Sequence, residues 1–374
     1  MSAGLRYIEE FRDPALGKAL LCALFEKAAK LPLSPVRIME FCGGHTHAFH
    51  RFGLLPLLPP TIRMIHGPGC PVCILPKGRI DAAIALALQK EVILVTYGDV
   101  LRLPASQGAT LMKARSQGAD VRILFSSMEA LRLAEKHPDR EVIFFAIGFE
   151  TTTPPTAAVI LEAHRLGLRN FSVFSNHVLT PAAMRGILSE TALDGIIGPS
   201  HVSTIIGTRP YDFVSRDFGV PVVVAGFEPL DLLLSLRMLL SQIADGRPEV
   251  ENEYGRAVLP EGNPHALKVI DRVFLKGKDF EWRGLGVLPE SSLEIRPEFA
   301  AFDAQRRFEI RIGSVSDPGV CECGDILKGL KGPRDCRIFG TLCTPDNPVG
   351  ACMVSAEGAC AAAYHYGTVE GEAS

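Results

Sequence analysis

Residues 142–155 read VIFFAIGFETTTPP, and the predicted fold rests on the pattern within this stretch. The run Val142–Ile147 is apolar throughout, which predicts a strand covered on both faces, as in a parallel sheet. A glycine and a polar loop with three threonines and two prolines follow the run. The prolines indicate the start of a helix, and we expect a threonine hydroxyl to cap it. The alternative is that these hydroxyls line a ligand cleft.

Similar apolar runs recur along the chain, with helical patterns between them. The other predicted strands are Arg37–Phe41, Ile62–His66, Val92–Thr96, Val121–Phe125, Phe171–Ser175, Gly195–Ile197 and Val220–Ala225. Residues Lys77–Lys90 carry apolar residues at helical spacing. The alternation predicts an α/β fold made of two similar Rossmann-like lobes with mainly parallel sheets. A C-terminal cysteine-rich iron–sulfur region completes the predicted architecture.

Four segments are predicted. Residues 1–30 form an N-terminal helical segment that packs with the C-terminal region, residues 31–136 form lobe I, and residues 137–245 form lobe II. In residues 246–374 the strand rhythm disappears, so we expect helices with extended connectors followed by the cysteine-rich region. Ligands of open α/β sheets bind at the carboxyl ends of the strands, which is where we expect the site.

Composition excludes several classes of protein. The chain has 374 residues, of which 47% are hydrophobic and 22% are charged, and this is an ordinary globular composition. Its formal net charge of -3, without a basic block, argues against nucleic acid as the main partner. The first residues contain acids and no apolar core, unlike a signal peptide. The apolar stretch 220–244 contains Glu228, Asp231 and Arg237, so we expect no membrane span and a cytoplasmic protein.

The ten cysteines are unevenly placed. Cys22 stands alone, three cysteines fall between Cys42 and Cys73, and six fall between Cys321 and Cys360. In a reducing compartment, such clusters indicate metal binding or redox chemistry before structural disulfides.

The first candidate site is Cys42-Gly-Gly-His45-Thr-His47, which directly follows a predicted strand. The two glycines allow a tight turn and a close approach of the backbone, so that Cys42 and His45 face the same point. A thiolate and an imidazole are either metal ligands or a nucleophile and its base. The alternative is a turn with a purely structural role, in which the thiol is buried and the histidines have hydrogen-bond partners.

The second candidate is Gly67-Pro-Gly-Cys70-Pro-Val-Cys73. The CxxC spacing brings two sulfur atoms into bonding range, which favours a dithiol/disulfide pair. Half of a zinc site is the alternative, with tail cysteines as the other half. Pro71 disfavours a helical Cys70, unlike the thioredoxin pattern. If electrons pass between this pair and the tail, the tail must fold back against the first lobe.

The third candidate is the tail. Its six cysteines are Cys321, Cys323, Cys336, Cys343, Cys352 and Cys360. Zinc ribbons need two CxxC pairs, and the tail has none, whereas thiolates from irregular loops suit an iron–sulfur cluster. Our predicted ligands are Cys323, Cys336, Cys343 and Cys360, because Gly324 leaves room beside Cys323. Cys352 is the alternative to Cys360. The other possibility is that the tail thiols are buried and bind no metal.

Taken together, these motifs resemble the HypD family of nickel–iron hydrogenase maturation proteins. The resemblance rests on FCGGHTH at 41–47, GPGCPVC at 67–73, GFETTTP at 148–154, SNHV at 175–178, CECGDILKG at 321–329 and FGTLCTPDNPVGACMVSAEGACAA at 339–362. It covers nearly the whole chain. It implies a scaffold that, with a small HypC-type chaperone, holds iron while the Fe(CN)2CO group is assembled. A HypE-type partner donates cyanide, and the group passes through HypC to the hydrogenase large subunit.

The resemblance also implies roles for single residues. Cys42 becomes the ligand of the iron that is being decorated, and His45 assists as a second ligand or a hydrogen-bond donor to cyanide. Cys70 and Cys73 become a redox pair, and the tail cysteines hold a 4Fe-4S cluster. We expect Gly43 and Gly44 to leave space for the iron group, and Thr151 and Thr152 to donate to it across the cleft.

Two rival functions remain at this point. An iron–sulfur thiol/disulfide oxidoreductase with a diffusible substrate would use the cluster and the CxxC pair, and Cys42 would be incidental. A zinc-stabilised interaction module would have no redox role. Binding of iron together with a small partner protein distinguishes the scaffold from both.

Overall fold

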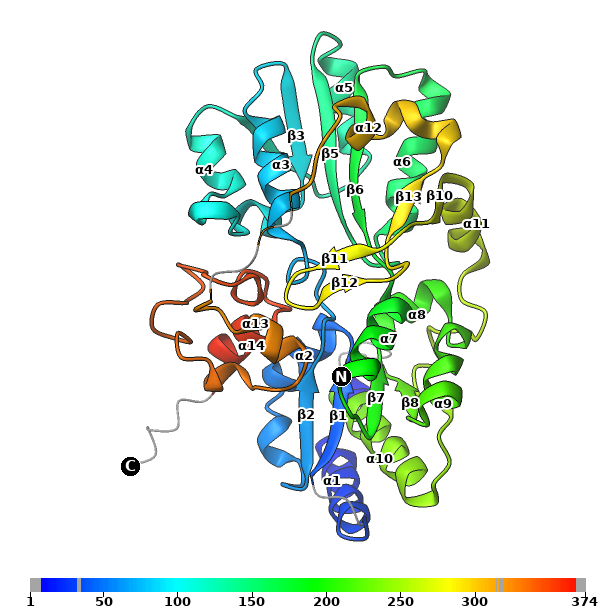
Figure 1. Ribbon diagram of the computed structural model, residues 1–374. Helices are drawn as coiled ribbons and strands as arrows, with labels where there is room; N and C mark the ends of the chain where they lie inside the picture. Colours follow the sequence, from blue (N-terminus) through cyan, green and yellow to red (C-terminus); the bar gives the residue numbers. More distant parts are fainter. Residues whose placement is uncertain (1–7, 32–34, 314, 316–318, 368–374) are drawn as a thin grey trace, which may run out of the picture.

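The computed structural model describes residues 8–31, 35–313, 315 and 319–367, and Figure 1 shows how its elements are arranged. The first and last seven residues of the predicted terminal segments lie outside the described residues. Two parallel sheets dominate the fold. Sheet A has the order β2-β1-β7-β8-β9, and sheet B has the order β4-β3-β5-β6. The predicted α/β class with mainly parallel sheets is therefore confirmed.

The strands are short and mostly buried. Sheet A consists of β1 (Val36–Glu40), β2 (Ile62–His66), β7 (Gly195–Gly198), β8 (Val222–Val224) and β9 (Val250–Asn252). Sheet B consists of β3 (Val92–Thr96), β4 (Asp120–Ile123), β5 (Glu141–Gly148) and β6 (Phe171–His177). All eight predicted strands are present, because runs of Val, Ile and Phe form strands wherever helices can cover both faces.

Helices connect the strands and cover the sheets. The first seven are α1 (Pro14–Ala28), α2 (Gly43–Arg51), α3 (Lys77–Ala87), α4 (Leu111–Ser116), α5 (Glu129–Lys136), α6 (Thr153–Leu166) and α7 (Thr180–Glu190). The others are α8 (Ser200–Ile206), α9 (Asp212–Phe218), α10 (Pro229–Asp245), α11 (Pro264–Val273), α12 (Ala304–Arg307), α13 (Cys323–Leu327) and α14 (Ala359–Tyr366).

The two sheets do not follow the predicted lobe ranges. Sheet A joins β1 and β2, from range 31–136, to β7 and β8, from range 137–245. Sheet B takes β3 and β4 from the first range and β5 and β6 from the second. The chain crosses to sheet B after β2 and returns after β6. The contiguous division is therefore corrected, because the rhythm of strand and helix is the same whichever sheet a strand joins.

Two further predictions change in the structure. Residues 246–312 contain strands, namely β9 and the antiparallel pairs β10 (Phe274–Lys276) with β13 (Leu293–Ile295) and β11 (Phe280–Trp282) with β12 (Gly286–Leu288). These strands have three residues each, too few for a visible alternation. Helix α1 packs mainly against α10, which precedes the predicted C-terminal region. One contact with that region is made by Phe11, whose ring centre lies 3.9 Å from the Arg256 guanidinium.

The cysteine-rich tail lies against sheet A, beside β2 and α2 (Figure 1). Helix α14 packs on α2, α13 contacts β2, and Arg102 donates a 2.7 Å hydrogen bond to the carbonyl of Val354. The tail thus folds back against α2 and β2 of the predicted first lobe, as we expected if electrons pass between it and the CxxC pair. The carboxyl ends of β1, β2 and β5 meet the tail in one buried core.

Candidate functional site

Cys42 lies where β1 ends and α2 begins, and 5% of its surface is exposed. Its own N–H donates to the carboxylate of Glu40 over 2.8 Å. Burial raises the pKa of the thiol to about 12, and the carboxylates of Glu357 and Glu40 add to this, outweighing the backbone N–H groups of Gly44 and His45. The resting form is therefore the neutral thiol. A cation that binds this sulfur must displace its proton.

Glycine at position 69 brings the CxxC motif onto Cys42. A Cβ atom on Gly69 would lie 2.5 Å from the backbone nitrogen of Cys42 and 2.6 Å from its Cα. The N–H of Gly43 also donates to the Gly69 carbonyl over 3.0 Å. The two motifs are thus in direct backbone contact, and only glycine permits that contact.

The predicted tight turn at Gly43 and Gly44 is instead the first turn of α2. The predicted open space beside these glycines is also filled. A Cβ on Gly43 would meet the Cβ of Glu357 at 2.5 Å, and one on Gly44 would meet the ring of Phe227 at 2.5 Å. The glycines make room for these two side chains, and no local pattern indicates either contact, because Glu357 and Phe227 are distant along the chain.

His45 is fully buried in the first turn of α2, next to Cys42. Its Nε2 atom pairs with the hydroxyl of Ser200 over 2.8 Å and lies 3.1 Å from the carbonyl oxygen of Ala225. Its Nδ1 atom is buried and has no hydrogen-bond partner in the described part of the chain. Burial lowers the pKa of His45, so the ring is neutral and keeps one nitrogen available.

Glu40 is a site residue that sequence reasoning missed. It is fully buried and accepts hydrogen bonds from the Cys42 N–H, the Thr46 hydroxyl and, over 3.0 Å, the Nδ1 atom of His66. This carboxylate therefore ties the end of β2 to the start of α2. The available signal was an acidic residue in an otherwise apolar strand, which is expensive to bury without partners.

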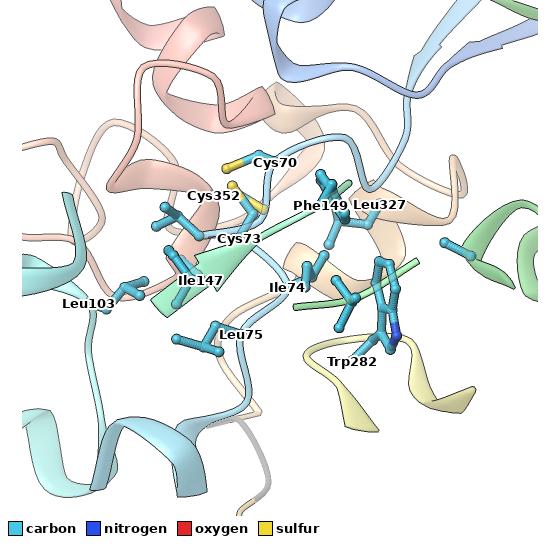
Figure 2. Packing of buried hydrophobic residues seen from close by; sticks show 14 of the residues in the cluster. Cys70, Cys73, Ile74, Leu75, Leu103, Ile147, Phe149, Trp282, Leu327 and Cys352 are labelled. Carbon is cyan, nitrogen blue, oxygen red and sulfur yellow. The ribbon is translucent and has the colours of Figure 1, made fainter. Parts of the chain in front are cut away.

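Cys70 and Cys73 lie in a turn after β2, and they are 3% and 1% exposed. Figure 2 shows both next to Cys352 of the tail. The thiol of Cys73 is within hydrogen-bonding distance of both Cys70 and Cys352, and burial raises its pKa. Hydrogen bonds from Cys323 and Cys73 lower the pKa of Cys352 to about 6. A continuous set of sulfur contacts thus joins the CxxC turn to the tail.

The other tail cysteines lie around Cys323. Its sulfur is 3.3 Å from that of Cys321 and within hydrogen-bonding distance of Cys360. Cys343 accepts a hydrogen bond from the Val349 N–H over 3.4 Å, whereas Cys336 lies beside Glu322. All ten cysteines are free thiols. No group of three or more His, Cys, Asp or Glu side chains in residues 8–31, 35–313, 315 and 319–367 is arranged to hold a metal ion.

The loop after β5 differs from its prediction. Helix α6 does begin beside the two prolines, but no threonine side chain caps it. Thr152 instead donates back to the carbonyl of Ile147 over 3.1 Å, so its hydroxyl is occupied within its own loop. Glu150, which the sequence did not single out, is buried and accepts from the N–H and hydroxyl of Thr180. Burial raises the pKa of Glu150 to about 7.

These contacts define the class of protein: a parallel α/β protein in which buried thiols are collected between strand ends and a cysteine-rich tail. No helix within the described residues is long and apolar enough to cross a membrane.

Comparison with known proteins identifies the family. The profile described as "HypD: Hydrogenase formation hypA family" matches residues 18–367. The hydrogenase expression/formation protein HupD of Azotobacter chroococcum is 56% identical over 370 residues, with 97% of each chain covered. The hydrogenase maturation factor HypD of Cupriavidus necator is 53% identical, with 97% of each chain covered. That of Escherichia coli is 45% identical, with 99% of this chain and 100% of the relative covered. The chain therefore belongs to the HypD family of hydrogenase maturation factors.

Proposed function

We propose that this chain is the scaffold on which iron receives its cyanide and carbon monoxide ligands during maturation of nickel–iron hydrogenase. The iron group, Fe(CN)2CO, is cargo. A small HypC-type chaperone shares it, a HypE-type protein supplies cyanide, and the hydrogenase large subunit receives it through HypC. The observation that carries the proposal is the buried Cys42 thiol at a strand end, in backbone contact with the CxxC turn.

Cys42 suits a transferable ligand. At a pKa of about 12 the thiol is neutral, so the sulfur binds metal only where a cation replaces the proton. The N–H groups of Gly44 and His45 then stabilise the thiolate. The free Nδ1 atom of His45 is the second group that we assign to the cargo, as a ligand or as a partner of a cyanide nitrogen. Because this chain supplies only one or two ligands, the iron keeps free coordination positions for a ligand from the partner protein.

We propose Cys70 and Cys73 as a redox pair. Closing a disulfide between them breaks two S–H bonds and passes two electrons and two protons to a disulfide of a partner protein, which becomes a dithiol. Their spacing permits the bond, and the contact with Cys352 links the pair to the tail. Burial of both thiols argues against a rival oxidoreductase that reduces a diffusible substrate, because such a substrate must reach the sulfur.

The tail thiols fit a 4Fe-4S cluster by donor chemistry, and binding it requires the side chains to move from their present positions. We assign Cys336, Cys343 and Cys360 as ligands. The fourth ligand is one of the adjacent residues Cys321 and Cys323, whose sulfur atoms lie 3.3 Å apart. The sequence prediction is Cys323. The thiol of Cys323 is, however, already paired with that of Cys352, which favours Cys321. When bound, such a cluster supplies single electrons.

The experiment is anaerobic co-purification of each variant with the HypC-type partner, followed by infrared spectroscopy. Cys42→Ala should keep the fold and the tail iron and lose the cyanide and carbonyl bands. Cys22→Ala, at an exposed cysteine of α1, is the control and should keep them. Intact bands in Cys42→Ala would overturn the assignment of Cys42 as the iron ligand and would make Cys70 and Cys73 the next candidates.

Cysteine-to-serine substitution at each of the six tail positions tests the cluster. Iron and acid-labile sulfide should fall in four variants and stay near full occupancy in two, one of them Cys352→Ser. Comparing Cys321→Ser with Cys323→Ser identifies the fourth ligand. Full cluster content in Cys336→Ser would refute the set, and stoichiometric zinc without sulfide would favour the interaction module.

A further inference from the structure

A pocket of about 400 Å3 lies where the tail packs against β2 and α2, and none of the cysteines lines it. Its walls come from several elements that are apart in the sequence, including Phe49 of α2, Ile65 of β2 and Ile326 of α13. Glycine builds the junction: Gly329 has a φ of +72°, and a Cβ there would lie 2.5 Å from the Ile65 side chain. The volume is in the usual range for a small-molecule site.

The charge on this pocket has one sign. Arg63, Lys331 and Arg334 line it, and no Asp or Glu of the described chain does. Lys331 is partly neutralised, because its ammonium contacts Glu322 over 2.5 Å. Arg63 is exposed on the edge strand β2 and has no ion-pair partner among residues 8–31, 35–313, 315 and 319–367. Such a rim attracts an anion.

Aromatic rings and apolar side chains line the interior of the pocket. The rings of His50 and His66 lie 5.1 Å apart at an angle of 38°, and Tyr366 adds a third ring to the lining. The Nε2 atom of His50 is buried without a hydrogen-bond partner in the described chain. A ligand that offers a flat body with one polar edge would satisfy this nitrogen and the surrounding apolar surface together.

We propose that this pocket binds a small organic anion, a carboxylate, sulfonate or phosphate on a flat apolar body. Arg63 holds the charged group, Arg334 adds positive charge to the rim, and the histidine rings contact the body. The site lies close to the iron-handling residues, since His66 bonds Glu40 and Glu40 accepts from the Cys42 N–H. The proposal does not depend on the iron chemistry.

The test uses a pair of fluorescent probes on the full chain. Anilinonaphthalene sulfonate carries the anion, and N-phenyl-1-naphthylamine has the same rings without it. We expect one saturable site for the sulfonate, with affinity that falls as salt rises. Arg63→Gln should weaken its binding about three- to tenfold, as expected for an exposed charged contact.

Matched variants separate this site from general surface binding. Arg63→Lys should keep most of the affinity, and Arg115→Gln, at an exposed arginine of α4, should leave it unchanged. Equal affinity for both probes, or an unchanged affinity in Arg63→Gln, would overturn the proposal. Tail iron and the infrared bands should be the same in Arg63→Gln as in the native chain, so the failure of either proposal remains distinguishable.

Discussion

Replacing Gly69 with alanine tests whether the contact between the two cysteine motifs holds the site together. The added Cβ would lie 2.5 Å from the nitrogen of Cys42, whereas an ordinary contact begins at 3.4 Å. The Cβ is fixed rigidly to the backbone of residue 69, and the nitrogen belongs to the backbone of Cys42, so the two segments must separate by almost 1 Å. Overpacking of this kind costs about 1–3 kcal/mol. Loss of the hydrogen bond from Gly43 to Gly69 adds about 1 kcal/mol.

We therefore expect the free energy of unfolding of Gly69→Ala to fall by about 2–4 kcal/mol. Urea unfolding followed by tryptophan fluorescence measures it, because Trp282 is the single tryptophan, is buried, and stacks on Phe149. Gly255→Ala is the control, since a Cβ there meets nothing within 4 Å. If Gly69→Ala proves as stable as the control, close approach at Gly69 does not hold the motifs together.

Three other outcomes follow from the structure. Gly350→Ala should lower the iron content of the tail although every thiol is kept, because the added Cβ would lie within 2.6 Å of two tail sulfur atoms. Gly319→Ala is the control and should keep the iron content, because a Cβ there meets nothing within 4 Å. The pKa of Glu150 is raised to about 7, so its contribution to stability is present below pH 4.5 and is lost as the pH rises through 7. Titration of Glu150 should thus lower the free energy of unfolding by about 2 kcal/mol between pH 5 and 8. The drop should be smaller by that amount in Glu150→Gln, because Glu253, whose pKa burial also raises to about 7, titrates over the same range in both proteins. At pH 8 iodoacetamide should modify Cys22 quickly and Cys42 hardly at all by mass spectrometry, since the thiolate reacts and Cys42 holds its proton; equal rates would contradict the raised pKa.

Local patterns in the sequence determined the strands, the fold class and the cysteine motifs. Each predicted strand lies within two residues of an observed one, because a short run of Val, Ile and Phe carries its own preference for extended, covered structure. The Cys42 and CxxC motifs lie after β1 and β2, as expected, because a loop position follows directly from the strand that precedes it.

The tertiary structure decided everything that depends on residues far apart in the chain. Strand pairing placed β1 and β2 beside β7 and β8, so the lobes could not be divided by a single cut in the sequence. Folding of the tail brought Glu357 against Gly43 and Cys352 against Cys73. The pKa of Cys42 depends on such neighbours and on burial. Burial and neighbouring charges result from packing across the sheets, which no local periodicity encodes. Desolvation and charge act through space and not along the chain.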